Sequence, residues 1–253
     1  MTINISRAEG IARIEIDVPP VNAITLQDYA DIRDAFRAAQ DWRDVNVILF
    51  TATGRKAFCA GLDLNEFLAA TIDQDPGRAR IVRDCFAAVR HAPVPVICAI
   101  NGPALGAGAV LASCADIRMA ADHVRFSTPE INVGRCGGAS HLMRHLPQGV
   151  LRQMYFTARP LSVQEAATYG FVQKIVPFED LDAEAMALAR EIAAKAPIGL
   201  RMAKEALNKV EFMQTEDGYQ LEQSYSTALM ATEDAREATR AVVEKRAPVW
   251  KGR

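Results

Sequence analysis

The order of apolar and polar residues predicts several strands. Residues 11–17 alternate, with Ile14 and Ile16 on one side of the chain, as in a strand with one buried face. Residues 45–51 and 94–100 are nearly continuous apolar runs of strand length. Such runs are typical of strands that are covered on both faces, as in a parallel sheet flanked by helices. Shorter strands are expected at residues 117–120, 124–126 and 172–176.

Helical periodicity alternates with these strands and then dominates the chain after about residue 137. Thr25 and Asp28 have the spacing of a capping box, and apolar residues follow them at helical intervals. Ser162 and Glu165 repeat that capping pattern. Further helices are expected over residues 81–89, 183–195, 199–210, 219–230 and 235–246. The pattern as a whole predicts an α/β core followed by a helical C-terminal region.

Composition narrows the class of protein. The chain has 253 residues, half of them apolar, and a formal net charge of −2, which gives no basic footprint for nucleic acid or an anionic membrane. An uncharged run over residues 92–115 is long enough for a membrane span, but Pro93, Pro95 and the turn at 101–103 interrupt it. Five cysteines without close pairing predict buried free thiols. We therefore expect a soluble, cytoplasmic protein.

Two loops follow the buried strands, and each supplies backbone N–H groups. One covers residues 56–64, and the other is the glycine-rich stretch 102–108, which leads into an apolar helix. Two amides that converge on one oxygen would form an oxyanion hole. The alternative is that the glycines only allow tight packing of a crossover. The stretch does not fit a Walker loop. It does not fit a dinucleotide fingerprint either, because this chain has Leu111 at the position of the third glycine.

Three further groups have both a structural and a chemical interpretation. Ser127 and Glu130 have capping-box spacing, which favours a helix start, although Glu130 in apolar surroundings also suits a general acid or base. His141 and His145 share a helix face but lack the other ligands of a metal motif, so we predict no metal site. Cys136 is expected to be a small buried thiol, and no Gly-x-Ser-x-Gly elbow is present.

Taken together, the motifs resemble those of the crotonase (enoyl-CoA hydratase/isomerase) superfamily. The likeness covers nearly the whole chain and implies a spiral of β-β-α units over residues 1–195, followed by a helical trimerisation region over residues 196–253. It also implies homotrimers that often pair into hexamers. The matching segments are Asn22-Ala23, residues 56–64, residues 95–116, Pro129-Glu130, residues 171–176 and residues 244–253.

The same resemblance implies an acyl-CoA thioester as substrate, with no separate cofactor. The thioester would lie across the loop of residues 60–65, near Lys56, with its oxygen bound by the amides of Leu62 and Ala107. Glu130 matches a catalytic glutamate of the family. The residues implied in substrate binding are Lys56, Ala60, Leu62, Asp63, Leu64, Asn65, Ala107, Val110 and Gly138.

One position departs from the family pattern. Val110 stands where hydratases have the first of two glutamates that activate water, and valine cannot accept a proton. The resemblance then favours isomerisation, or hydration that uses Glu130 alone. Conventional hydration, a hydroxycinnamoyl-CoA hydratase-lyase and a non-catalytic acyl-CoA-binding protein stay as alternatives. Arg135 and His141 lie in a loop expected to face the pocket, where either contacts the acyl group or faces solvent.

Overall fold

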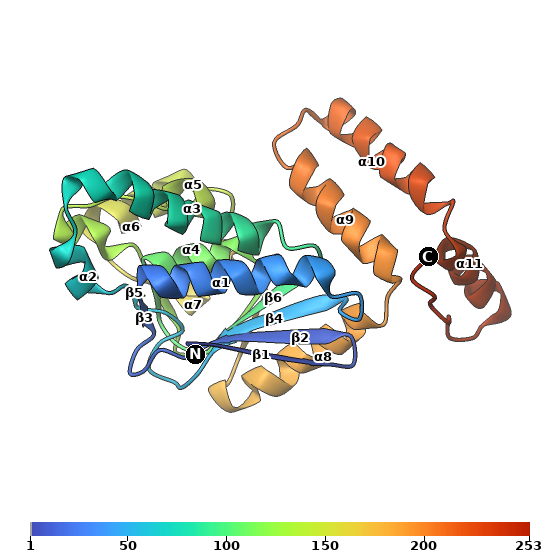
Figure 1. Ribbon diagram of the computed structural model, residues 1–253, viewed down its shortest axis with the longest axis horizontal. Coiled ribbons are helices and arrows are strands. Elements are labelled where there is room, and N and C mark those ends of the chain that lie inside the picture. Colours follow the sequence, from blue (N-terminus) through green and yellow to red (C-terminus); the bar gives the residue numbers. More distant parts are fainter. Residues whose placement is uncertain (1) are drawn as a thin grey trace.

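The computed structural model describes residues 2–253, and its core is a large, mostly parallel sheet (Figure 1). Within those residues the sheet has six strands, of which only the first pair is antiparallel. The strands lie in the order β1 (Ile3–Ala8), β2 (Ile11–Ile16), β4 (Val47–Ala52), β6 (Val96–Ile100), β8 (Ile117–Ala121) and β11 (Lys174–Val176). Every residue of β4 and β6 is buried, so the two continuous apolar runs are confirmed as doubly covered strands.

Short strands follow the long ones and form two small sheets beside the large sheet. One consists of β10 (Leu161–Ser162), β9 (Arg125–Ser127) and β7 (Ala104–Leu105), and the other pairs β3 (Ala23–Ile24) with β5 (Gly61–Leu62). A single parallel bridge between Cys59 and Ala104 joins the segments that lead into β5 and β7. The chain thus repeats a long strand, a short strand and a helix, which places successive short strands side by side.

Helices cover both faces of the large sheet (Figure 1). On one face lie α1 (Leu26–Ala38), α3 (Asp75–Arg90) and α4 (Ala107–Cys114), while α8 (Leu181–Ala193) covers the other. The expected capping boxes at Thr25 and Ser162 are both formed. The remaining core helices are α2 (Leu64–Ala69), α5 (Ala139–Leu142), α6 (Gln148–Thr157), α7 (Val163–Thr168) and the 3-10 turns η1 (Ala39–Asp41), η2 (Ile72–Gln74), η3 (Pro129–Val133) and η4 (Phe178–Asp180).

The last three helices extend away from the sheet (Figure 1). They are α9 (Pro197–Val210), α10 (Thr215–Leu229) and α11 (Glu233–Glu244), each beginning two to four residues before its predicted start. Lys204 of α9 is only 4% exposed, and its Nζ lies 2.6 Å from both carboxylate oxygens of Asp116. Asp116 also accepts a hydrogen bond from the Val96 amide at the start of β6. This ion pair therefore ties α9 to the sheet.

The uncharged run over residues 92–115 is buried in protein, as its turn and prolines predict. It forms β6, a turn, β7 and α4, and α4 has only eight residues. In residues 2–253 the structure contains no helix that combines the length and the apolar character required to cross a membrane. The edge strand β1 was not predicted, because the chain exposes every residue of it except Ile3.

The glycines of this run allow two backbone segments to touch. A Cβ atom on Gly108, in the first turn of α4, would lie 2.2 Å from the carbonyl oxygen of Cys59. The Leu105 amide donates to that same oxygen over 2.9 Å. Gly102 is similarly crowded, since its Cβ would lie 2.9 Å from the carbonyl oxygen of Arg55. The tight-packing interpretation of the glycine-rich stretch is therefore correct.

We expect Gly108→Ala to destabilise the protein by about 1–3 kcal/mol, because the new methyl group must push the Cys59 backbone away from α4. The matched control is Gly77→Ala in α3, where a Cβ meets nothing within 4 Å and the added methyl favours the helix. Denaturant unfolding of both variants measures the difference. Equal stability of Gly108→Ala and the wild type would contradict this description of the contact.

Candidate functional site

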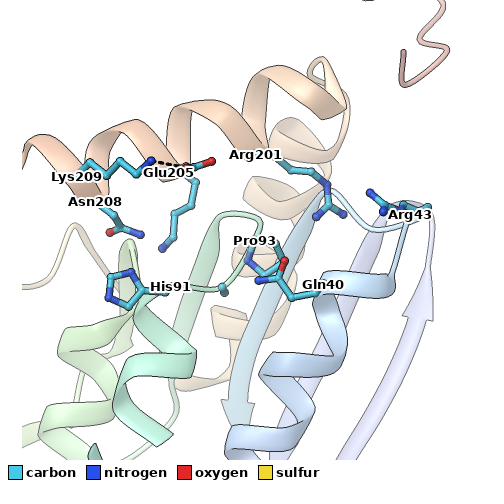
Figure 2. Close-up of a pocket in the computed structure, with 10 residues that line it drawn as sticks. Gln40, Arg43, His91, Pro93, Arg201, Glu205, Asn208 and Lys209 are labelled. Atoms are coloured by element: carbon cyan, nitrogen blue, oxygen red, sulfur yellow. Dashed lines mark hydrogen bonds and ion pairs between the residues drawn. The ribbon is translucent and has the colours of Figure 1, made fainter. Parts of the chain in front are cut away.

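Two cavities offer candidate sites, and the larger one lies beneath α9, between this helix and the segments that follow α1 and α3 (Figure 2). Its volume is about 600 Å³, and cationic side chains dominate its walls. The carboxylate among its lining residues, Glu205, is already paired with Lys209 over 2.6 Å, and Arg201 donates to the carbonyl oxygens of Trp42 and Val45. The pKa of His91 is lowered by burial and by nearby cations. The walls therefore attract anions, and the one carboxylate among them is already paired.

The smaller cavity, of about 300 Å³, is lined by the three residues predicted to be catalytic, Leu62, Ala107 and Glu130. It lies at the opposite end of α1, between β5, α2, η3 and the first residues of α4. Most of its walls are apolar, and its lining includes one acidic and one basic side chain. The lining residues are Tyr29, Ala60, Gly61, Leu62, Leu64, Phe67, Gly106, Ala107, Pro129, Glu130, Asn132, Val133 and Arg135.

Glu130 lies in this cavity with its carboxylate only partly satisfied. Its Oε2 atom is buried and has no hydrogen-bond partner in residues 2–253. Its Oε1 atom lies against Gly106, where a Cβ would be only 2.7 Å away, so a side chain at that position would displace the carboxylate. Burial raises the pKa of Glu130 above its ordinary value of 4.5. A carboxylate in this state is suited to accept and return a proton.

The alternative role of Glu130 in a capping box is wrong. The first residue before η3 is Thr128, and no side chain caps that turn. The Ser127 hydroxyl instead donates to the carbonyl oxygen of Ala158 over 3.2 Å. The turn η3 is a short 3-10 turn that begins at Pro129, so Ser127 lies too far before it to cap it. The Glu130 side chain is then free to line the cavity.

Backbone amides from two segments border the same cavity. Ala107 is the first residue of α4, so its N–H has no partner within the helix and lies at the positive end of the helix dipole. Directly after β5, the Asp63 amide donates to the carbonyl oxygen of Ile24. Successive amides of a strand point to opposite sides, so the N–H of Leu62 points away from β3. Both residues line the cavity.

The two segments are held close enough for these amides to act together. A Cβ on Gly61 would lie 3.9 Å from the Ala107 nitrogen and 3.3 Å from the carbonyl oxygen of Leu105. Positive φ values at Gly61 and Gly106 make both turns favourable for glycine. The arrangement can place two donors around one oxygen atom, with Glu130 beside it.

The predicted substrate-binding residues divide into two groups. Ala60, Leu62, Leu64 and Ala107 line the cavity. The others lie outside its lining. Lys56 and Asn65 are exposed at the surface, and the Asp63 carboxylate caps α2 by accepting from the amides of Asn65 and Glu66. The structure therefore gives Asp63 a structural role in shaping the loop.

Val110 is buried beneath the cavity rather than on its wall. The side chain is 2% exposed, and a Cβ on Gly138 would lie 2.4 Å from its Cγ2 atom. Val110 and Gly138 thus pack against each other, and neither lines the cavity. Of the residues that do line it, Glu130 alone carries a carboxylate.

Sequence reasoning did not identify Tyr29 and Phe67 as cavity residues. Tyr29 belongs to the periodic apolar face of α1, where it is indistinguishable from a core residue, and burial raises its pKa well above the ordinary value. Phe67 lies on α2, a helix that the apolar pattern does not mark. Neither position carries a motif that could have identified it.

The histidine and cysteine predictions have mixed outcomes. His141 does not face the cavity: its ring packs edge-on against Phe86, and Nδ1 lies 3.6 Å from the sulfur of Cys114. His145 lies with Nε2 2.9 Å from the carbonyl oxygen of Ser113, and burial lowers its pKa to about 4. The described residues contain no cluster suited to a metal ion. Cys136 is exposed, so its prediction as a buried thiol is wrong, whereas the other four cysteines are buried.

Comparisons with known proteins show which family the chain belongs to. Residues 6–253 match the family described as enoyl-CoA hydratase/isomerase. A (7aS)-7a-methyl-1,5-dioxo-2,3,5,6,7,7a-hexahydro-1H-indene-carboxyl-CoA hydrolase from Rhodococcus jostii is 38% identical over 226 residues, or 87% of this chain and 86% of the relative. The carnitinyl-CoA dehydratase of Salmonella typhi is 33% identical and covers 100% of this chain and 99% of its own.

The fold is also that of solved structures. The crystal structure of an enoyl-CoA hydratase from Bacillus anthracis superimposes with a TM-score of 0.96 at 30% identity, covering 100% of both chains. The predicted α/β class, with a crotonase-like arrangement and helices at the C-terminus, is therefore confirmed.

The raised pKa of Glu130 predicts a pH-dependent stability difference. Because folding disfavours the ionised carboxylate, the wild type loses stability as the pH rises from 4.5 through the raised pKa. Glu130→Gln, which stays neutral, should therefore have a higher Tm than the wild type at pH 7.5. The difference should shrink as the pH falls toward 4.5. Thermal unfolding across this pH range measures it, and a lower Tm for Glu130→Gln at pH 7.5 would contradict the account.

Proposed function

The chain belongs to the enoyl-CoA hydratase/isomerase family, and we propose that it moves a proton on an acyl-CoA thioester with Glu130 as its single acid–base group. The observation that supports this proposal is the carboxylate of Glu130, which is partly buried, has an unpaired oxygen and lies beside a pair of free amides. Isomerisation of an enoyl-CoA, or its hydration by one glutamate, is the reaction that this arrangement suits best.

In the proposed mechanism the thioester oxygen accepts hydrogen bonds from the amides of Leu62 and Ala107. When Glu130 removes a proton from the carbon chain, negative charge moves onto that oxygen, and the fixed amides stabilise the enolate without reorganising. One donor of this kind contributes on the order of 3 kcal/mol to the transition state. The cavity is mostly apolar, which strengthens both the donors and the base.

Glu130 then returns the proton to a different carbon, which moves the double bond. In the hydration variant it instead removes a proton from water, the hydroxide adds to the β-carbon of the enoyl thioester, and Glu130 returns the proton to the α-carbon. Both reactions need the ionised carboxylate at the start, so the rate should fall as the pH is lowered through the raised pKa of Glu130. Hydration by two carboxylates is disfavoured, because the position of the second carboxylate is occupied by Val110, which is buried against Gly138.

A second candidate is hydrolytic cleavage of a ring-containing acyl-CoA. It is favoured by the two hydrolase relatives, from Rhodococcus jostii and Mycobacterium tuberculosis, at 38% and 36% identity. Glu130 would remove a proton from one water molecule, and the hydroxide would attack a ring carbonyl carbon. The bond between that carbon and its ring neighbour would then break, and the neighbouring carbon would take the proton back from Glu130. The same amides would stabilise the negative charge that develops on an oxygen.

Turnover of a panel of enoyl-CoA and ring-containing acyl-CoA thioesters in D2O, followed by mass spectrometry, separates these reactions. Deuterium uptake with a moved double bond indicates isomerisation. A mass gain of one water with the ring and chain intact in the fragment spectrum indicates hydration, and the same mass gain with an opened ring indicates hydrolysis. Glu130→Gln should lower the rate by about 100-fold or more, whereas Glu191→Gln, on an exposed face of α8, should retain full activity. Unchanged turnover by Glu130→Gln would overturn the proposal.

We also propose that α9, α10 and α11 associate with other copies of the chain, as the resemblance implies for a trimer or hexamer. These helices extend from the core, and together with the turns that join them they expose large apolar side chains, including Phe212 at 74%, Met230 at 73% and Val242 at 78%. Sedimentation equilibrium should give a mass three or six times that of the chain. A monomer at micromolar concentration would contradict the proposal.

A further inference from the structure

Arg135 is held beside Glu130 by the backbone. The turn η3 ends at Gly134, whose φ of +70° reverses the chain, and the Arg135 amide then donates to the carbonyl oxygen of Glu130 over 2.9 Å. Two residues later, the Tyr155 hydroxyl bonds both the amide and the carbonyl of Gly137. The loop that carries Arg135 is therefore attached at both ends, and Arg135 lines the cavity.

The guanidinium of Arg135 lies on an aromatic wall of that cavity. Its central carbon is 4.4 Å from the centre of the Phe67 ring, which orients the planar group. Its ion-pair partner in the described residues is Asp75, over 3.2 Å, and the two side chains are 45% and 47% exposed. Exposed pairs of this kind contribute little stability. Most of the five N–H donors of the guanidinium therefore stay available to a ligand.

The apolar residues around Arg135 allow its charge to distinguish between acyl groups with different ends. The neighbouring lining residues Leu64, Phe67 and Val133 are apolar, and Arg135 supplies the positive charge. An acyl group that ends in a methyl would desolvate the guanidinium without replacing its bonds to water. A carboxylate would instead form paired, charge-assisted hydrogen bonds with the planar fork.

We propose that Arg135 binds a carboxylate at the far end of the acyl group, so that the substrates are CoA monothioesters of short dicarboxylic acids. This inference rests on the proposed function, because it assumes that the thioester occupies the Leu62 and Ala107 amides. The phosphates of CoA are a second possible source of negative charge for the same guanidinium. Two thioesters with identical CoA and different acyl ends separate the two sources.

Calorimetric titration with glutaryl-CoA and pentanoyl-CoA tests the inference, because these ligands have five-carbon acyl chains and differ in the terminal carboxylate. The wild type should bind glutaryl-CoA about tenfold or more tightly than pentanoyl-CoA. Arg135→Gln should remove that preference by weakening glutaryl-CoA binding without weakening pentanoyl-CoA binding, and Arg135→Lys should restore part of it. Arg152→Gln, an exposed change on α6 outside the cavity, is the matched control.

A second variant acts in the opposite direction. Asp75→Asn removes the carboxylate that competes for the guanidinium, so it should tighten glutaryl-CoA binding and leave pentanoyl-CoA binding unchanged. The inference is overturned if the wild type shows no preference between the two thioesters. It is also overturned if Arg135→Gln weakens both equally, which would assign the cation to CoA phosphate or to the fold.

The binding and turnover measurements test the carboxylate site and the proposed function separately. If glutaryl-CoA binds with the expected preference but no acyl-CoA is turned over, the proposed function fails and the carboxylate site stands. If enoyl-CoA thioesters are turned over with no preference for a carboxylate, the proposed function stands and the carboxylate site fails.

Discussion

The contact between the Cys59 backbone and the first turn of α4 is the constraint on which the site depends. Gly108 permits it, because any side chain there would overlap the carbonyl oxygen of Cys59. The Leu105 amide then bonds that oxygen, and the bridge between Cys59 and Ala104 aligns the two segments. Since the large sheet holds β4 and β6 as neighbours, the amides that follow them are placed before any ligand arrives. Preorganised donors of this kind need no rearrangement when charge develops.

The same packing governs the electrostatics of Glu130. Gly106 leaves space for the carboxylate, and the apolar walls remove most of its water, which raises its pKa. A charge held without a partner costs stability, as is common for groups whose placement serves function. Where a second carboxylate would complete a conventional hydratase site, the buried Val110 packs against Gly138. The site therefore combines fixed amides with one base, and Arg135 supplies a cation at its wall.

Much of the fold and part of the site follow from sequence. The apolar runs, the capping boxes at Thr25 and Ser162 and the strand-to-helix glycines each reflect a local rule, and local rules survive tertiary packing. The close packing predicted for the glycine-rich stretch is present, and it brings the Ala107 amide to the cavity, where the oxyanion-hole interpretation stays a prediction. The failures have a common origin. Ser127 has the spacing of a cap, but its hydroxyl bonds Ala158, which is distant in sequence. The direction of Arg135 and the anchoring of α9 by Asp116 likewise depend on contacts between remote segments.

The central claim is that the amides of Leu62 and Ala107 bind one thioester oxygen next to Glu130. A crystal structure of Glu130→Gln with a bound enoyl-CoA tests this directly. We expect the thioester oxygen within about 3 Å of both amide nitrogens, with the reacting carbons facing residue 130. A thioester oxygen that contacts neither amide, or a ligand bound instead in the basic cavity beneath α9, would contradict the account.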